Sequence, residues 1–191
     1  MELKDLVFIK ENILSKKSFN IFTKVSKEIL DYENASVILN GNNKVDKKIR
    51  QVKTRFLTNT NKETSFTNVY WYKYLSFKFL KTLNEMYETQ KALERPIHMD
   101  LTLSLLKYDV GAFYNAHSDY HVTIPRRISF IYGLNDDYEG GELHFHFPDD
   151  DNNKIKIKSN SLIIFPSNHL FVHSVAKVTK GVRYVIVGWM P

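Results

Sequence analysis

The sequence predicts a mainly β fold, a sandwich or a barrel, with supporting helices in its N-terminal half. After Pro96 the chain breaks into short runs of alternating apolar residues separated by Gly, Pro, Asn and Asp. This pattern is typical of short strands joined by frequent turns. Before Pro96, apolar residues recur at helical spacing in two places. We therefore expect one domain over residues 1–191, with residues 1–96 as helical support and lid segment and residues 97–191 as the β core.

The N-terminal elements are expected in the order strand, helix, polar segment and helix. Residues 6–14 fit a strand that runs into a helix, and Ser15 or Ser18 can cap that helix, because a serine oxygen accepts a hydrogen bond from the free N–H groups of a first turn. A second helix is predicted over residues 69–91. The expected apolar stripes of the two helices are Phe19, Phe22, Val25 and Ile29 in the first, and Leu75, Phe79, Leu83 and Met86 in the second.

Between these helices, residues 31–68 form a polar segment with turn signals at residues 40–43 and 58–62. We expect this segment to act as a lid over a cleft. Its basic residues suit an acidic or extended partner and are equally compatible with a solvated surface; they are Lys44, Lys47, Lys48 and Arg50.

Eight short strands are predicted after Pro96. They cover residues 101–108, 113–117, 127–134, 142–147, 154–158, 161–165, 171–178 and 183–189. Each is too short for a helix of ordinary length and is bounded by turn residues.

The composition is that of a globular chain, with 43% apolar and 25% charged residues. The absence of cysteine excludes disulfides, iron–sulfur clusters and thiol nucleophiles. The apolar run at residues 6–9 is too short for a signal peptide, and no run is long enough to span a membrane. We therefore expect a soluble cytoplasmic protein. The net charge of +6 is spread along the chain and by itself does not indicate nucleic-acid binding.

The stretch NAHSDYH, residues 115–121, places possible metal ligands close together. If it is extended, His117 and Asp119 point to the same side, because alternate residues of a strand share a face. His121 could be a third ligand on that face, although a polar turn would contain the same residue types. His173 lies on a later predicted strand, and two histidines with one carboxylate form the facial triad of non-haem Fe(II) oxygenases.

The C-terminal half resembles the 2-oxoglutarate/Fe(II)-dependent dioxygenases, and among them the prolyl 4-hydroxylase branch. The resemblance rests on four blocks in the family's order and spacing: YDVGAFYNAHSDYH, RRISFIYGLNDDYEGGELHF, SLIIFPSNHLFVHSV and TKGVRYVIVGW. It covers residues 101–191 well and the N-terminal half loosely. It implies a double-stranded β-helix, or jelly roll, backed by helices.

By this resemblance, His117, Asp119 and His173 are the iron ligands. Arg183 would hold the distal carboxylate of 2-oxoglutarate, and Tyr108 would contact the same co-substrate. A guanidinium suits this role because it is permanently charged and forms paired hydrogen bonds with a carboxylate.

The resemblance also places Arg127 at the mouth of the site in a substrate-binding role, which its neighbour Arg126 could take instead. Trp189 matches the tryptophan that ends the family's last block and is a second candidate for substrate binding. The chain departs from many family members in having Leu143 where a threonine often follows Gly-Gly-Glu, so the co-substrate pocket would lack one hydroxyl contact. It also has Arg183 where many prolyl 4-hydroxylases have lysine, which keeps the charge.

His144 and His146 are a rival metal-binding pair. They alternate with Leu143, Phe145 and Phe147, and burying the apolar face of such a strand costs less than burying the histidines. We therefore expect both histidines to face outward.

The function implied is an Fe(II)- and 2-oxoglutarate-dependent dioxygenase that hydroxylates proline in a peptide or protein and releases succinate and CO2. The implied cofactors are Fe(II), 2-oxoglutarate and O2, with ascorbate as a candidate reductant. We expect a monomer with a proline-containing peptide or protein as partner, and neither a nucleic-acid nor a membrane partner.

Three alternatives remain at this point. They are hydroxylation of a free amino acid or another small molecule, nucleic-acid demethylation within the same superfamily, and a degenerate binding module without catalysis. Repair demethylases carry a second arginine six residues after the co-substrate arginine, where this chain has Trp189, which argues against demethylation.

Overall fold

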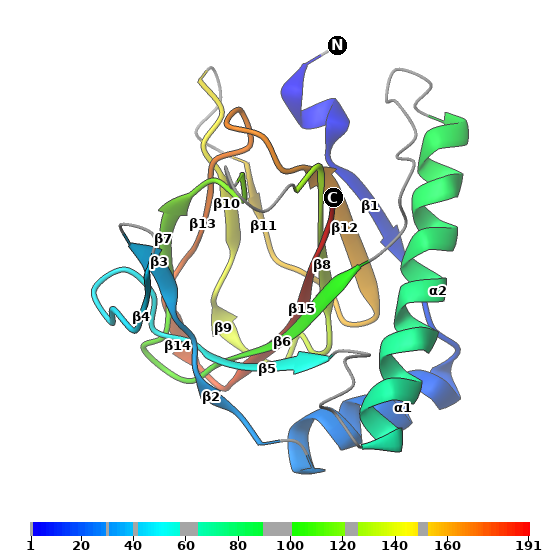
Figure 1. The fold of residues 1–191 in the computed structure, drawn as a ribbon. Coiled ribbons are helices and arrows are strands. Elements are labelled where there is room, and N and C mark those ends of the chain that lie inside the picture. Colours follow the sequence, from blue (N-terminus) through cyan, green and yellow to red (C-terminus); the bar gives the residue numbers. More distant parts are fainter. Residues whose placement is uncertain are drawn as a thin grey trace.

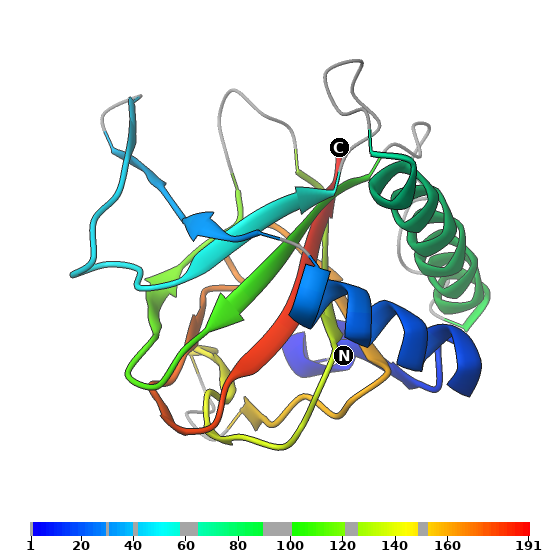
Figure 2. The same ribbon diagram turned by 90° about the horizontal axis from the view of Figure 1, so that it is seen from below.

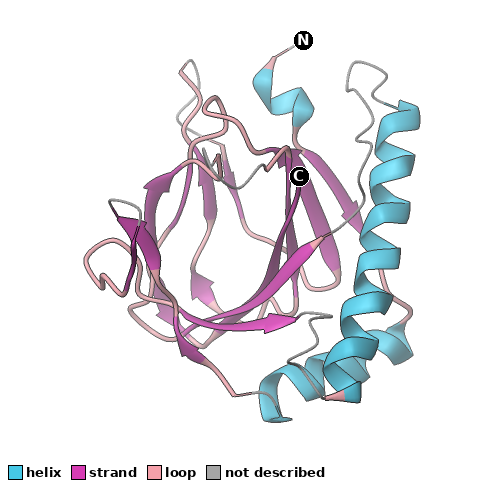
Figure 3. Cartoon of the chain, in the orientation of Figure 1, coloured by secondary structure: helices cyan, strands magenta, loops and turns pink. Residues whose placement is uncertain are grey.

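The computed structural model describes residues 2–29, 31–39, 42–57, 65–89, 101–120, 126–148 and 153–191. Within them, a large antiparallel sheet faces a smaller one, and helices cover the outer face of the large sheet (Figure 1). Figure 2 shows the helices on the same side of the large sheet. The predicted class, mainly β with N-terminal helices and a jelly-roll core, is confirmed (Figure 3).

The helical elements are all N-terminal among the described residues: η1 (Leu3–Leu6), α1 (Lys16–Lys24), the π-helical η2 (Val25–Ile29) and α2 (Phe66–Thr89). The large sheet has the order β1-β12-β8-β15-β6-β5-β2. Its strands are β1 (Phe8–Glu11), β2 (Glu33–Asn34), β5 (Lys53–Leu57), β6 (Thr102–Tyr108), β8 (Ile128–Gly133), β12 (Ser161–Pro166) and β15 (Arg183–Met190).

The small sheet has the order β11-β10-β13-β7, and two further strand pairs form separate two-stranded sheets. The strands of the small sheet are β7 (Tyr114–His117), β10 (Leu143–Phe145), β11 (Lys154–Ile155) and β13 (His173–Val175). The two pairs are β3 (Val37–Leu39) with β4 (Asn42–Lys44), and β9 (Glu139–Gly140) with β14 (Val178–Lys180).

Alternation along the strands of the large sheet separates two cores. In β15, Tyr184, Ile186 and Met190 pack toward the helices, whereas Val185 and Val187 pack toward the small sheet. Successive side chains of a strand point to opposite faces, so a strand covered on both sides reads as nearly continuous apolar sequence. The second core, between the sheets, is the one that surrounds the functional site.

The helices form where the apolar stripes predict them. Ser15 caps α1 by accepting a hydrogen bond from the backbone N–H of Ser18 at 3.2 Å. The predicted stripe of α2 is fully buried, with Leu75, Phe79 and Leu83 at most 1% exposed. These side chains pack on the large sheet, where Phe79 lies against Phe130 with ring centroids 6.2 Å apart.

All eight strands predicted after Pro96 are present, but the prediction for residues 31–68 is incomplete. The described part of this polar segment contains four strands, and β5 and β2 extend the large sheet beside β6. Strand β5 was not predicted because backbone hydrogen bonds to β6 hold it in place, and such bonds leave little trace in the side-chain pattern. Its most deeply buried residue is Leu57, at its end. Residues 58–64 lie outside the described part of the chain.

None of the described helices is both long and apolar enough to cross a membrane.

Candidate metal centre

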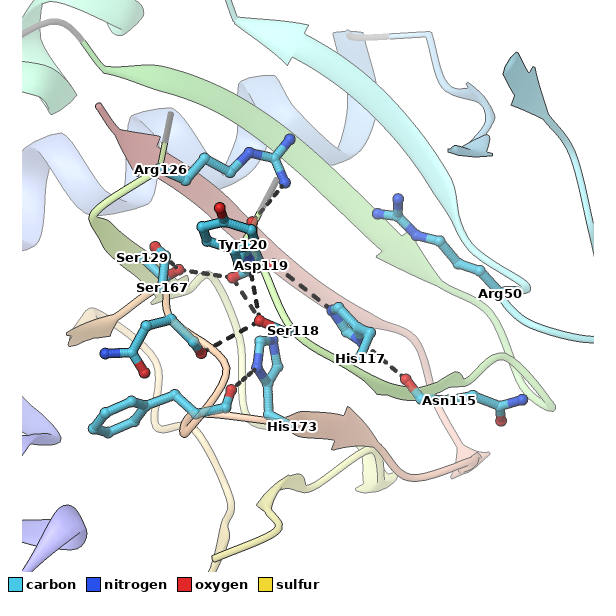
Figure 4. A network of polar contacts seen from close by, with 12 residues as sticks. Arg50, Asn115, His117, Ser118, Asp119, Tyr120, Arg126, Ser129, Ser167 and His173 are labelled. Carbon is cyan, nitrogen blue, oxygen red and sulfur yellow. Dashed lines mark hydrogen bonds and ion pairs between the residues drawn. The ribbon is translucent and has the colours of Figure 1, made fainter. Parts of the chain in front are cut away.

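Three potential metal ligands meet at the edge of the cavity between the sheets. His117 ends β7, Asp119 follows two residues later, and His173 begins β13. Because β7 and β13 are antiparallel neighbours, His117 and His173 are direct cross-strand partners. The Nε2 atoms of both histidines lie 3.8 Å from Asp119 carboxylate oxygens (Figure 4). One ligand atom from each residue lies within 4.8 Å of the other two.

Hydrogen bonds to the far sides of the rings orient the two histidines. The Nδ1 atom of His117 lies 2.8 Å from the carbonyl oxygen of Asn115, and that of His173 lies 3.0 Å from the carbonyl oxygen of Phe171. A carbonyl oxygen accepts only, so Nδ1 carries the proton and Nε2 keeps its lone pair toward the centre of the triad. Such contacts fix the tautomer and the ring plane of a metal ligand.

The carboxylate of Asp119 is held by a serine pair. Ser129 donates a hydrogen bond to Asp119 Oδ2 at 2.7 Å, and its oxygen lies 2.7 Å from that of Ser167. Both serines are buried, on or next to strands of the large sheet. The carboxylate is therefore tied to the large sheet, while the two histidines come from the small one.

The protonation states of the triad suit a metal at neutral pH. Burial, aided by the nearby His173, lowers the pKa of His117 to about 4. Burial alone would raise the pKa of Asp119, but His173, His117 and the Ser129 hydrogen bond outweigh it and bring the pKa below its usual range. A neutral imidazole and an ionised carboxylate are the forms that bind metal. Two histidines and one carboxylate on one side of a cavity fit Fe(II) with open coordination positions.

A cavity of about 330 Å³ extends from the triad between the sheets. Its walls are mostly apolar and include Leu106, Ile131 and Val185. This volume is at the lower end of the range for small-molecule sites.

Arg183 lies at the inner wall of the same cavity and is 1% exposed. Its guanidinium carbon is 4.7 Å from the centre of the Tyr108 ring, its cross-strand partner. Among the described residues, its Nε and Nη1 atoms have no hydrogen-bond partner. Arginine stays protonated when buried, so leaving these donors unmatched costs free energy. The arrangement fits an anionic ligand with a planar carboxylate.

The space beside Arg183 depends on a glycine. Gly141 has φ +68°, and a Cβ atom there would lie 2.9 Å from Arg183 Cδ. A larger residue would be strained and would press on the arginine side chain. Gly141 therefore makes room for the buried arginine.

Comparisons with known proteins agree with this geometry. Residues 103–191 match the family model of the 2OG-Fe(II) oxygenase superfamily. The matched residues are just under half of the chain, and over them the chain is similar to this superfamily.

The curated relatives are named as hydroxylases. A PKHD-type hydroxylase of Gloeothece citriformis is 38% identical over 102 residues, which are 50% of this chain and 44% of that protein. One from Prochlorococcus marinus (strain NATL2A) is 37% identical over 111 residues, 52% of this chain and 49% of that protein. The chain thus spans about half the length of the curated relatives it matches.

Solved structures show the same fold over nearly the whole chain. A prolyl-4-hydroxylase of Pseudomonas putida has a TM-score of 0.69 at 17% identity, covering 97% of this chain and 92% of that one. A prolyl hydroxylase of Trichoplax adhaerens, solved with a hypoxia inducible factor peptide fragment, has a TM-score of 0.71 at 19% identity, covering 96% and 82%.

Most of the site residues that were predicted from the sequence line the cavity. His117, Asp119, His173, Arg183 and Tyr108 all do so. Trp189 lines it as well, and Leu143, in place of the usual threonine, is a fully buried apolar wall residue.

Arg127 is exposed and is not among the residues that line the cavity, so its role in substrate binding stays a prediction. Its neighbour Arg126 lines the cavity, with its guanidinium carbon 4.0 Å from the centre of the Trp189 ring. The strand β8 begins one residue after Arg127, and alternation turns adjacent side chains to opposite sides.

The expectation for the rival histidine pair is confirmed. Leu143 and Phe145 are completely buried, whereas His144 and His146 are half-exposed and do not line the cavity. His146 instead contacts Ser174 Oγ at 2.9 Å. His121 lies outside the described residues.

Sequence reasoning did not single out Tyr114 and Ser129, and it named Arg50 only as one of four basic residues of the polar segment. Tyr114 stacks on His117 with ring centroids 3.6 Å apart, and the guanidinium carbon of Arg50 lies 4.6 Å from the Tyr114 ring centre. Ser129 holds the carboxylate of the triad. Tyr114 and Ser129 lie within the blocks that resemble the family, but Arg50 lies outside them and had no signal beyond its charge.

Proposed function

We propose that the chain is an Fe(II)- and 2-oxoglutarate-dependent dioxygenase that hydroxylates proline in a peptide or protein. One observation carries the proposal: the His117, Asp119 and His173 triad and the unmatched buried donors of Arg183 face the same cavity. A metal and a dicarboxylate can therefore be held together, with the dicarboxylate reaching from the metal to the arginine.

The chain's own residues bind and orient the reactants. His117 and His173 offer neutral Nε2 atoms, and Asp119 offers an anionic oxygen, on one side of the metal position. Arg183 would hold the far carboxylate of 2-oxoglutarate, and the Tyr108 ring packs against that guanidinium. The apolar walls exclude water and strengthen these charged contacts. Bound Fe(II) supplies the oxidising chemistry, with O2 as oxidant and decarboxylation of 2-oxoglutarate to succinate as the source of electrons.

Proline as the target is supported by the prolyl hydroxylases that share this fold. It is also supported by the physical fit. A proline has a fixed φ angle and favours an extended backbone, which lowers the entropy lost when a peptide binds across a cavity mouth.

The test uses the full chain with Fe(II), 2-oxoglutarate and O2 and a panel of proline-containing peptides. We expect succinate, and a peptide product heavier by one oxygen in mass spectrometry. His173→Ala should abolish both products and lower the affinity for Mn(II), measured separately by electron paramagnetic resonance. His146→Ala is the matched control, because His146 contacts a residue of β13, the strand of His173, without lining the cavity.

The results separate this proposal from its alternatives. Oxidation of free amino acids without any peptide product would indicate a small-molecule hydroxylase, and activity confined to methylated oligonucleotides would indicate a demethylase. Metal affinity lost equally in His146→Ala would show that the triad has been misassigned.

A further inference from the structure

Two arginines outside the metal triad converge on the mouth of the cavity. Arg50 follows the turn before β5 and forms a β-bridge with Tyr114, and Arg126 lies two residues before β8. Both line the cavity. Figure 4 shows their guanidinium groups pointing toward each other across the space above the triad.

Both guanidiniums are held in place by aromatic rings. That of Arg50 lies over Tyr114, with its carbon 4.6 Å from the ring centre, and that of Arg126 lies over Trp189 at 4.0 Å. A guanidinium that lies flat on an aromatic ring keeps its N–H edge free to donate hydrogen bonds in its own plane. The two arginines are therefore preorganised donors.

Their donors are poorly matched within the described residues. Arg50 donates to the carbonyl oxygen of Ser36 at a long 3.4 Å, and its buried Nε has no acceptor. Arg126 donates to the carbonyl oxygen of Asp119 at 3.3 Å. Burial lowers the pKa of Arg126, Asp119 opposes this, and Arg50 adds to the lowering, so the two cations are close enough to repel each other. An anion bound between the two guanidinium groups would offset this repulsion.

The charges that line the cavity also favour an anionic ligand at its mouth. Its charged lining residues in the described chain are three arginines and one carboxylate, Asp119. Fe(II) and 2-oxoglutarate, when bound, carry equal and opposite charges, and Arg183 is taken up by the far carboxylate. Asp119 is then a metal ligand, and the two arginines at the mouth remain without a counter-charge.

We propose that Arg50 and Arg126 form a carboxylate seat for the substrate, so that the preferred peptide carries an aspartate or glutamate one or two residues from the hydroxylated proline. This inference rests on the proposed function. An extended peptide advances ~3.3 Å per residue, so the neighbours of a proline held at the metal reach the mouth. A carboxylate between two guanidinium edges can accept several charge-assisted hydrogen bonds at once.

A peptide fits these observations better than a nucleic acid. Nucleic-acid backbones are bound by a track of basic residues along a groove. Here the described cavity lining contains arginines and no lysine, and the guanidinium groups of the two at the mouth face each other. This arrangement suits a single carboxylate.

The experiment compares otherwise identical proline peptides that carry Glu or Gln at each of the two positions on either side of the proline. We expect the wild-type chain to favour Glu over Gln at one of these positions by at least about tenfold in kcat/KM, as a charge-assisted contact would give. Arg50→Gln should remove most of this preference, because it should lower kcat/KM for the Glu peptide much more than for the Gln peptide.

Two control variants also remove one positive charge, but at positions that do not line the cavity. Lys47→Gln removes an exposed cation from the turn before Arg50, and Arg127→Gln removes the exposed neighbour of Arg126. Both should keep the preference for Glu. Binding of fluorescein-labelled Glu and Gln peptides to the Mn(II)-loaded chain, followed by anisotropy, gives the same comparison without turnover.

The outcomes separate the carboxylate seat from the proposed function. Failure to form succinate under any condition overturns the proposed function, and the anisotropy ratio then still decides whether the seat exists. Equal binding of the two peptides, an equal effect of Arg50→Gln on both, or activity on oligonucleotides alone would overturn the seat. Free proline is tested as a further substrate to identify the source of the carboxylate. If Arg50→Gln lowers turnover of free proline, and no peptide is turned over, the two arginines bind the carboxylate of a free amino acid and the peptide seat is overturned.

Discussion

Arg183 is buried on all sides at the start of β15, and two of its nitrogens lack partners among the described residues. An apolar residue of similar length would fill this position without leaving donors unmatched. A buried charge without a partner destabilises a fold, so its presence is explained by a ligand rather than by packing. The same reasoning applies more weakly to Arg50, whose Nε is buried and unmatched.

At the residue scale, Arg183→Met should separate ligand binding from stability. We expect the apparent constant for 2-oxoglutarate to rise at least about tenfold, because a charge-assisted contact contributes about 1.5–3 kcal/mol and 1.4 kcal/mol is one decade. The melting temperature without ligands should stay the same or rise, because the buried charge is removed. Succinate formation against 2-oxoglutarate concentration, together with thermal unfolding, measures both.

Arg127→Met is the control for that experiment, since it makes the same chemical change at an exposed position outside the cavity. It should leave both quantities unchanged. An unaltered co-substrate constant in Arg183→Met would refute the assignment of Arg183.

At the scale of elements, strand pairing assembles the metal centre. His117 and His173 come from β7 and β13 and face each other across the pair, and the serine of β8 holds Asp119 from the other sheet. Each ligand is thus fixed by a rigid strand or by a residue next to one. Helix α1 has a different role, because it supports the outer face of the large sheet through Phe22, which is completely buried.

The cap of α1 gives a test at this scale. Ser15→Ala removes the acceptor for the backbone N–H of Ser18 and should lower the free energy of unfolding by about 1 kcal/mol, as loss of an N-cap does. Ser15→Asp keeps an acceptor there and should be close to wild type. Urea unfolding measures the difference, and equal loss in both variants would mean that the serine acts by some contact other than the cap.

At the scale of the whole molecule, the residues that fold together extend beyond the residues that match the superfamily. The match covers residues 103–191, but β1, β5 and β2 lie in the same large sheet and α2 buries its apolar stripe on it. Burial of a Leu, Phe or Met side chain contributes about 1.5–3 kcal/mol, so a few such residues equal the whole stability of an ordinary domain. We propose that residues 1–191 form one domain.

A fragment of residues 101–191 tests this proposal. Without the helices, the outer face of its large sheet would be exposed, including Phe130, Tyr132 and Ile186. We expect it to lack a cooperative thermal transition in near-ultraviolet circular dichroism and to bind a hydrophobic dye, whereas the full chain unfolds cooperatively. A fragment with a sharp transition at the full chain's midpoint would show that the N-terminal half is a separate unit.

The sequence by itself determined the local elements and one pair of ligands. The helices, the eight C-terminal strands and the outward turn of His144 and His146 follow from periodicity, because an apolar stripe or face must be buried. His117 and Asp119 were recognisable as neighbours from their spacing, and His173 and Arg183 from the family resemblance.

Tertiary structure decided the contacts between distant segments. It placed Arg126 in the lining of the cavity, added β5 and β2 to the large sheet, and brought Arg50 over Tyr114 beside the triad. Backbone hydrogen bonds hold these strands together, and such bonds form between nearly any residue types, so side-chain patterns carry little information about them. The face of the sheet on which an arginine at a strand end lies also depends on the pairing register of that strand. A shift of one residue in this register moves the side chain to the other face.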